Sequence, residues 1–500
     1  MNTRIAAGAA LLCGTLAGTA ALASAAAPEG LLTSVKPYVK PIDSGYRIKP
    51  LISVGDQVPE TSHPAARYRM VGIPDGLGAR HAGGGKVELF MNHELGNTVT
   101  SEPDVGGPAN RGAFVSKFTL GRDGSVLSGE RAYDTVFRQN TKVGPAPDAT
   151  NSTPGFARFC SGALADANEG FDQAIYPTGE EGGGAATFDG RGGQSVAVFA
   201  NEVHTLPKMG RFPKENTIIL PGTGRRTVAF PTEDGPAGPE SQLYMYVGLK
   251  QRHARTVLGR NGLDNGRLYV LVLDGHQTEA DLVSGQASGH WVEIPDADTM
   301  TEAELEAAVD AEGAFGFVRI EDAAAAKRPN GDLYFVTTGG SVENKLGRIY
   351  RLQVDPRHPL RGGRLEVLSN ADQVIAAGGD TAISPDNIDT SGQYLMVNED
   401  GTAESRPVMA AKGRDGSVWR FDLRPGRDFQ RFRVAQLNPP GRDGVAVGPG
   451  VWETSGIIDS SGLFGAGSWL YDVQAHPPTA APGPGTVEDG QLVLMERRRR

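Results

Sequence analysis

One short pattern recurs along the chain: a glycine, one or two further residues, an aliphatic–aromatic pair, and then alternating residues. Such alternation is typical of a β-strand with one buried face, and the glycine is typical of the turn before it. Strand signals repeated at irregular spacing indicate the blades of a β-propeller that carries insertions of differing length. The pattern appears at 266–271, 331–335, 347–352, 392–397, 416–421 and 490–495.

Further strands are predicted at 87–91, 112–118 and 195–199. The 68 glycines and 33 prolines together make about a fifth of the chain, which favours many turns over long helices. A β-sandwich would give similar local signals, but one sandwich seldom needs this many residues. We therefore expect one large all-β propeller domain over residues 26–500.

Three segments depart from the strand pattern. Residues 301–309 begin with Thr-x-x-Glu, a capping box, and predict a short helix. The Pro/Gly-rich stretches at 221–239 and 477–486 predict loops, and neither marks a linker between domains.

The N-terminus predicts export. Residues 1–25 contain one basic residue, Arg4, an apolar stretch and a terminal Ala-Ser-Ala, which is typical of a cleaved signal peptide. No other run is long and apolar enough to span a bilayer, so we expect no transmembrane anchor in the mature chain. The expected destination is the periplasm or the outside of the cell, and we expect a monomer.

The net charge of the chain indicates which classes of binding partner are plausible. The formal net charge is −10, which makes a specific nucleic-acid partner a poor candidate. Acidic side chains are instead suited to hard cations such as calcium, which prefer oxygen ligands.

Cys160 is the only cysteine outside the predicted signal peptide, because Cys13 lies within it. An exported protein usually has no use for an unpaired thiol. The thiol is therefore either a buried, inert side chain or a ligand of something, and a transition metal such as iron is the candidate.

Acidic turns recur where apolar runs end, and in a propeller such strand ends converge on the central channel. Several carboxylates gathered there would repel one another unless cations lay between them. The scattered histidines do not support zinc, and no EF-hand loop is present. The turns lie at 92–94, 179–181, 201–204, 214–216, 233–235, 319–322, 384–387, 398–401 and 452–454.

The order of several motifs resembles that of the PhoX-type alkaline phosphatases, exported bacterial metallophosphatases. The chain departs from the family where Lys214 stands in place of a frequent histidine, where the spacing from Cys160 to the Glu-Glu pair is longer, and where the signal has a single arginine. The resembling segments are 87–94, 160–162 with 179–181, 210–215, 317–321, and 384–387 with 398–401.

The resemblance implies a six-bladed propeller with Fe3+ and Ca2+ on its axis, acting on a small phosphorylated substrate. It would make Cys160, Glu215 and Glu321 iron ligands, and it would direct Arg319 toward the substrate phosphate as the catalytic and substrate-binding arginine. Arg319 as a structural arginine paired with a carboxylate is an equal alternative. The candidate calcium ligands are Glu180, Glu181, Asp234, Asp386, Asn387 and Asp400.

Two other functions stay open. One is a different propeller hydrolase, such as a calcium-dependent lactonase or a phytase-like esterase that uses oxygen ligands alone. The other is a non-enzymatic propeller that binds a partner and uses calcium for stability. The three functions differ in whether iron is bound and whether phosphate esters are hydrolysed.

Overall fold

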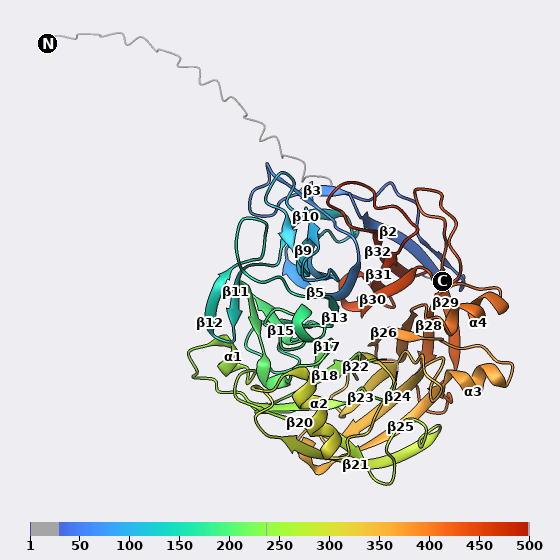
Figure 1. The fold of residues 1–500 in the computed structure, drawn as a ribbon. Coiled ribbons are helices and arrows are strands. Elements are labelled where there is room, and N and C mark those ends of the chain that lie inside the picture. Colours follow the sequence, from blue (N-terminus) through green and yellow to red (C-terminus); the bar gives the residue numbers. More distant parts are fainter. Residues whose placement is uncertain (2–29, 237, 499–500) are drawn as a thin grey trace.

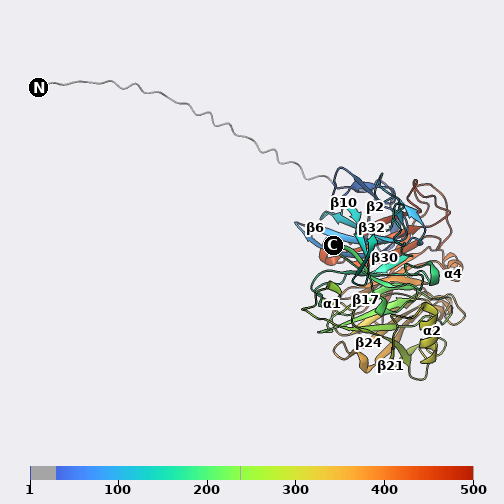
Figure 2. The ribbon, with the colours of Figure 1, turned by 60° about the vertical axis from the view of Figure 1, so that its left-hand side comes forward.

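The computed structural model describes residue 1, residues 30–236 and residues 238–498, so the predicted signal peptide at 1–25 lies almost wholly outside the described residues. Mostly antiparallel sheets surround a central axis (Figure 1). The turned view shows that α2 and α4 lie on the same side of this ring (Figure 2). No helix in the described ranges is both long and apolar enough to cross a membrane.

The first two large sheets contain the N-terminal part of the ring. The first has the order β10-β9-β6-β5, with strands at Val126–Arg131, Phe114–Leu120, Lys86–His93 and Pro74–Gly83. The second has the order β12-β11-β16-β15-β14-β13, with strands at Thr141–Pro145, Tyr133–Arg138, Asn201–Thr205, Ser195–Phe199, Tyr176–Glu180 and Phe159–Gly162.

The third sheet has nine strands, because a five-stranded unit and a four-stranded unit are joined where β21 pairs with β25. One unit is β17 (Lys214–Ile219), β18 (Arg226–Glu233), β19 (Tyr244–Leu249), β20 (Arg267–Leu273) and the long β21 (Gly285–Ile294). The other is β22 (Ile320–Ala325), β23 (Asp332–Thr337), β24 (Arg348–Val354) and β25 (Gly363–Asn370).

The last two large sheets join the two ends of the chain. The sheet β1-β29-β28-β27-β26 has strands at Val39–Pro41, Arg431–Leu437, Ser417–Asp422, Tyr394–Glu399 and Pro385–Thr390. The sheet β2-β32-β31-β30 has strands at Tyr46–Ser53, Asp489–Arg497, Trp469–Ala475 and Glu453–Asp459. Antiparallel pairing of β2 with β32 brings the first long strand onto the last, which closes the ring.

Short hairpins and helices lie outside the large sheets of the ring. Two short hairpins are β3 (Gln57–Pro59) with β4 (Arg67–Arg69) and β7 (Thr100–Ser101) with β8 (Asn110–Arg111). The helices are α1 (Val257–Arg260), α2 (Glu302–Ala311), α3 (Ala371–Ala376), α4 (Ser405–Ala411) and α5 (Ser461–Phe464). The predicted helix at 301–309 is confirmed as α2, and Thr301 forms the capping box with Glu304.

Hydrophobic side chains fill the space between neighbouring sheets. One such core joins Leu51 of β2, Leu77 of β5 and Leu470 of β31, so it packs the last sheet against the first. Because each sheet buries both faces against its neighbours, the strands show few exposed positions. The prediction of an all-β propeller is confirmed.

The loop prediction for 221–239 is wrong in its central part. Strand β18 occupies Arg226–Glu233, and its residues from Val228 to Glu233 are buried. The prolines at both ends of the stretch suggested a loop, but the apolar run between them is long enough to pair with β17. The stretch 477–486 contains no strand or helix, as predicted.

Candidate metal centre on the propeller axis

Six inner strands form the wall of the axis: β5, β13, β17, β22, β26 and β30 contact one another in that order, and β30 contacts β5. Each has a shift in its pairing register with the next strand of its sheet. Such a β-bulge sets two consecutive residues against one on the partner strand and re-aims their side chains. The bulges contain Asp75-Gly76, Cys160-Ser161, Glu215-Asn216, Glu321-Asp322, Asp386-Asn387 and Gly456-Ile457.

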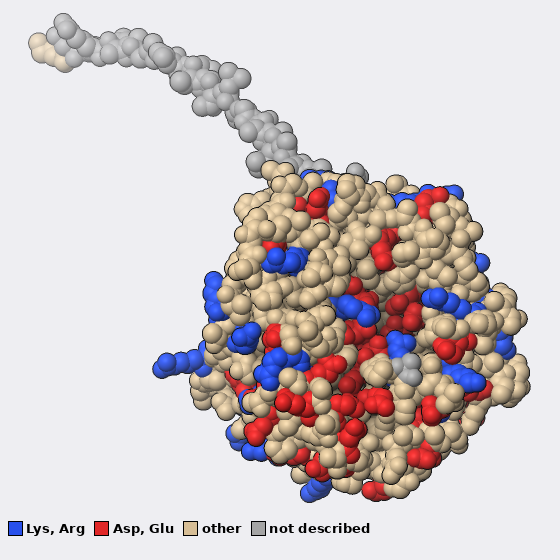
Figure 3. Space-filling model, in the orientation of Figure 1, with Lys and Arg blue, Asp and Glu red and all other residues tan. Residues whose placement is uncertain are grey.

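The first residues of these bulges bring acidic and thiol donors together. Three groups of donor atoms form, each with all atoms within 4.8 Å of one another. Cys160 belongs to two groups and Glu215 to two, so the groups form one continuous cluster. Figure 3 shows acidic side chains gathered in the hollow at the centre of the ring. The groups are Asp75, Glu94 and Cys160; Cys160, Glu181 and Glu215; and Glu215, Glu321 and Asp386.

Cys160 is buried among acids rather than aliphatic side chains. Its Sγ donates to Oδ2 of Asp75 at 3.0 Å. Burial and the nearby carboxylates Asp75 and Glu215 raise the pKa of the thiol well above its usual range. The structure thus places the lone cysteine on the axis, where the metal prediction requires it to be.

A second set of polar side chains comes from the ends of the adjoining strands. β6, β14, β18, β23 and β27 end at a buried residue, and the residue that follows reaches the axis. In β14 the buried residue is Glu180, whose Oε1 accepts from the backbone N–H groups of Ala157 and Phe188. Glu181 follows it and joins the cluster. The corresponding residues on the other strands are Glu94, Asp234, Thr338 and Asp400.

Two arginines enter the cluster from equivalent positions. Arg158 contacts Glu94 at 2.7 Å and Glu181 at 2.8 Å. Arg319 contacts Oδ1 of Asp234 at 2.9 Å and Oε1 of Glu321 at 3.0 Å. The carboxylates Glu94 and Glu181 raise the pKa of Arg158, and for Arg319 the neighbouring Glu321 and Asp234 outweigh the effect of burial and raise its pKa too.

Both arginines have left-handed backbone conformations, with φ of 49° for Arg158 and 58° for Arg319. Each stands two residues before the first bulge residue, as do Ile73 and Ser384, which also have positive φ. Such conformations are uncommon for residues other than glycine and concentrate at functional sites. The same turn therefore introduces four of the six inner strands.

The carboxylates of the donor cluster are suited to bind cations, because they lie close together and several of their oxygens have no partner within the described ranges. Burial, together with neighbouring acids, raises the pKa values of Asp75, Glu215 and Asp386 well above the usual range for carboxyl groups. Oε2 of Glu181, Oε2 of Glu215 and Oδ1 of Asp386 are buried and have no hydrogen-bond partner in the part of the chain that the structure describes. Buried polar atoms are normally satisfied, so these oxygens are suited to coordinate metal ions.

The other predicted ligands lie at the edge of the cluster. Asp234 is paired with Arg319, and Asp400 lies close enough to contribute to the raised pKa of that arginine. The amide of Asn387 donates to Oδ1 of Asp75, while its own Oδ1 is buried without a partner. Glu180 stands apart from all three donor groups.

Sequence reasoning missed Asp75, Glu94 and Arg158. A signal for Asp75 was present, because Pro74-Asp75-Gly76 parallels Pro385-Asp386-Asn387. Glu94 was recognised as part of an acidic turn but not as a donor, and Arg158 stands two residues before Cys160 as Arg319 does before Glu321.

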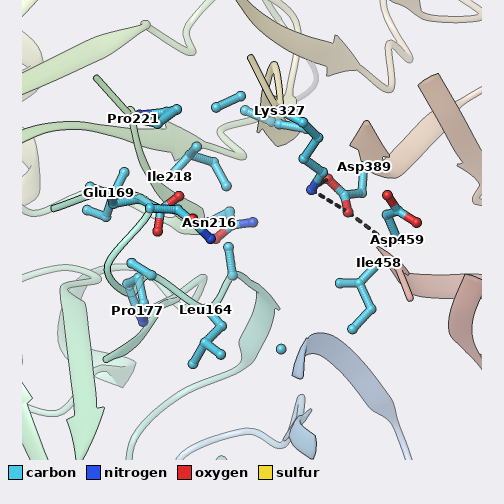
Figure 4. Close-up of a pocket in the computed structure, with 18 of the residues that line it drawn as sticks. Leu164, Glu169, Pro177, Asn216, Ile218, Pro221, Lys327, Asp389, Ile458 and Asp459 are labelled. Carbon is cyan, nitrogen blue, oxygen red and sulfur yellow. Dashed lines mark hydrogen bonds and ion pairs between the residues drawn. The ribbon is translucent and has the colours of Figure 1, made fainter. Parts of the chain in front are cut away.

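A separate cavity of about 640 Å³ lies further along the same axis. The later residues of the inner strands line it, among them Ile218, Ala324 and Ile388. Figure 4 shows Lys327 paired with Asp389 at its rim, beside Asp459. Asn216 and Asp322, the second residues of two bulges, also line this cavity and directly follow Glu215 and Glu321 of the donor cluster in the chain.

The ring of sheets and the donor cluster define a class of protein: a β-propeller with candidate metal-binding groups on its axis. Residues 198–438 match the family model described as alkaline phosphatase PhoX. This match confirms the resemblance predicted from the motifs of the chain. It supports an alkaline-phosphatase-like hydrolase.

The fold is also that of a solved structure. PhoX of Pseudomonas fluorescens in complex with vanadate, a transition state analogue, has 16% sequence identity and a TM-score of 0.63, over 94% of this chain and 97% of that chain. A Dyadobacter fermentans protein of unknown function has 8% identity and a TM-score of 0.42, over 91% of this chain and 100% of that chain. No curated protein matches the chain.

Proposed function

We propose that the protein is an exported hydrolase of phosphate esters that acts at the axial cluster with Fe3+ and Ca2+. The observation that carries this proposal is the meeting of one thiol, six carboxyl groups and two arginines on the axis of a PhoX-family propeller. A cluster so rich in negative charge needs cations, and a phosphate ester needs positive charge around its oxygens.

The chemistry of the donor atoms indicates which residues would bind iron and which would bind calcium. A thiolate is a soft ligand and suits iron, so Cys160 with Glu215 and Glu321 would hold iron. Carboxylate and amide oxygens suit calcium, and these come from Asp75, Glu94, Glu181, Asp234, Asp386, Asn387 and Asp400. When bound, the ions would neutralise phosphate charge and lower the pKa of an attacking oxygen.

The arginines are suited to bind the transferring phosphoryl group. A guanidinium donates two parallel hydrogen bonds to phosphate oxygens and stays charged at any working pH. The side chain of Arg319 is 25% exposed and that of Arg158 is 49% exposed, so both reach solvent beside a buried cluster. Arg319 is thus the proposed catalytic arginine. Arg158 contacts the same cluster through Glu94 and Glu181.

Neighbouring groups hold the donors in place. The Thr338 hydroxyl donates to Oε1 of Glu321 at 2.5 Å. The amide of Asn92 donates to Oγ1 of Thr178 at 2.8 Å and to the carbonyl oxygen of Ser161 at 3.2 Å, which fixes the strand that carries Cys160. Such supporting contacts keep a site preorganised, so that little rearrangement is needed on substrate binding.

The test combines elemental analysis with a chromogenic phosphate-ester assay. The purified protein should contain iron and calcium and release p-nitrophenol from p-nitrophenyl phosphate. Glu215→Gln should lose iron and turnover together, whereas Glu366→Gln, an ion-paired residue of β25, should keep both. A protein that binds calcium alone and hydrolyses a lactone or carboxyl ester would favour the alternative hydrolase.

The proposed function also includes export of the protein and its oligomeric state. We infer cleavage after residue 25, a single domain over 26–500 and a monomer in the periplasm or medium. N-terminal sequencing of secreted protein tests the cleavage position, and light scattering tests the monomer. An intact N-terminus on protein retained in the cytoplasm would contradict the export proposal.

A further inference from the structure

Asp472 of β31 differs in its contacts from the buried carboxylates at equivalent positions of the ring. It is fully buried, and neither of its carboxylate oxygens has a hydrogen-bond partner within residues 30–236 and 238–498. It pairs with Ser455, the residue before the bulge of β30. An unpaired carboxylate in this position is costly unless it is neutral or binds a cation.

Equivalent positions on other strands show what is missing. Glu233 of β18 also faces the residue before a bulge, and its Oε2 accepts from the N–H of Gln242 at 2.7 Å. Glu399 of β27 accepts from the N–H of Ile383 at 2.7 Å and from Arg414. Asp472 is one methylene shorter than these glutamates and makes no such contact. The carboxylates at the equivalent positions of β18 and β27 therefore have hydrogen-bond donors, whereas that of Asp472 on β31 has none among the described residues.

The space beside Asp472 is bordered by other oxygens. A Cβ added at Gly456 would lie 2.9 Å from the carbonyl oxygen of Asp75 and 3.1 Å from Oδ1 of Asp472. Glycine, with a φ of 43°, leaves that space free of side-chain atoms. Gln474 lies two residues further along β31, on the same face, and its Oε1 is also buried without a partner.

We propose that these oxygens form a further calcium site, adjacent to the catalytic cluster: the Asp472 carboxylate, the Asp75 carbonyl and Oε1 of Gln474. The Gln474 amide N–H group donates to Asp75 and Glu94 of that cluster. Calcium accepts carboxylate, carbonyl and amide oxygens in flexible geometry. The ion would connect β31 of the last sheet to β5 of the first. It would thus fasten the junction at which the ring closes.

The distinguishing variant is Asp472→Asn. An asparagine replaces a protonated aspartic acid well, because it can donate to the Asp75 carbonyl, but it removes the negative charge that a cation needs. We expect the variant to carry one calcium fewer per chain after desalting, with iron content unchanged, and to lose part of the calcium-dependent rise in Tm. Glu233→Gln, which also removes a buried carboxylate, should keep the calcium content of the unaltered protein.

An Asp472→Asn protein with unchanged calcium content and unchanged response of Tm to calcium would overturn the site and indicate a protonated carboxyl. If the variant does not fold, crystals of the unaltered protein grown with calcium decide the matter. An anomalous peak between Asp472 and the Asp75 carbonyl supports the site, and its absence there refutes it. Neither result depends on phosphatase activity, so failure of this site leaves the proposed function standing.

Discussion

The Cys160 thiol donates to the Asp75 carboxylate at 3.0 Å, although 85 residues separate the two along the chain. The contact joins the inner strands of two neighbouring sheets at the level of their bulges. It exists because the ring of sheets brings equivalent strand positions to one axis, where each bulge offers a side chain to its neighbours.

Replacement of Cys160 tests the thiol as a ligand. Cys160→Ala removes the only soft donor of the cluster, so we expect iron content and phosphate-ester turnover to fall by at least 10-fold, on the order of the loss seen when a metal's surroundings are altered. Calcium content should fall less. Full iron content and full turnover in this variant would exclude the thiol from the metal centre.

Arg319 is tested by graded substitution. Arg319→Ala removes a guanidinium beside Glu321, and we expect kcat/KM to fall by about 10²–10³-fold, as for loss of one stabilising donor. Arg319→Lys should recover only part of this loss, because an ammonium cannot donate two parallel hydrogen bonds.

A matched control for Arg319 is Arg442→Lys, since Arg442 is an ion-paired arginine at Asp489. Its kcat/KM should stay within a factor of two of the unaltered protein, which is about 0.4 kcal/mol. Equal losses in the two lysine variants would favour a purely structural role for Arg319.

Removal of calcium should destabilise the fold. The carboxylates of Glu215, Glu321 and Asp386 are buried and have oxygens within 4.8 Å of one another, so without cations their ionised forms repel one another. We expect chelation by EGTA at pH 8 to lower Tm by several degrees and to abolish turnover, and added calcium to restore both. A Tm that is indifferent to EGTA would show that the acids are held by protonation or hydrogen bonds alone.

Glu279 positions the turn that carries Arg319. It is fully buried, and its carboxylate accepts from the N–H of Val318 at 3.0 Å, the Thr337 hydroxyl at 3.0 Å and the Tyr350 hydroxyl at 2.5 Å. Glu279→Ala leaves these donors unpaired, so we expect a loss of about 3–5 kcal/mol in the free energy of unfolding.

Denaturant unfolding of Glu279→Ala measures that loss, and kinetics below the unfolding transition measure its effect on the site. If the glutamate holds the Arg319 turn, kcat/KM should also fall while iron content is retained. A stable variant with unchanged kinetics would show that the turn is held by the rest of β22.

Most of the fold followed from the alternation of apolar residues after glycine turns, because that alternation reports a buried sheet face. All six segments with the repeated pattern lie on strands, from β20 to β32. The stretch around β18 escaped prediction because prolines flank it on both sides, and a strand among turn residues looks like a loop. Closure of the ring by β2 depends on pairing between the chain ends, which no local pattern reports.

The site was predictable only where residue type was unusual. Cys160 was conspicuous because it is the lone thiol outside the predicted signal peptide, and Glu215 and Glu321 followed from the family resemblance. The choice between Glu180 and Glu181 needed coordinates, because it depends on which of two adjacent side chains the end of β14 turns toward backbone amides. The signal for Arg158 was weak, because it consisted only of a position two residues before Cys160 that matches Arg319 before Glu321.

The repeated bulges have a consequence for how such a centre changes over time. Main-chain pairing, rather than any one side chain, sets the direction in which the two residues of each bulge project. Aspartate, glutamate, cysteine and glycine all occupy these positions in a single chain, so the scaffold tolerates exchange of residue type there. A relative could therefore acquire a new complement of ions through a few point substitutions, with no rearrangement of its backbone.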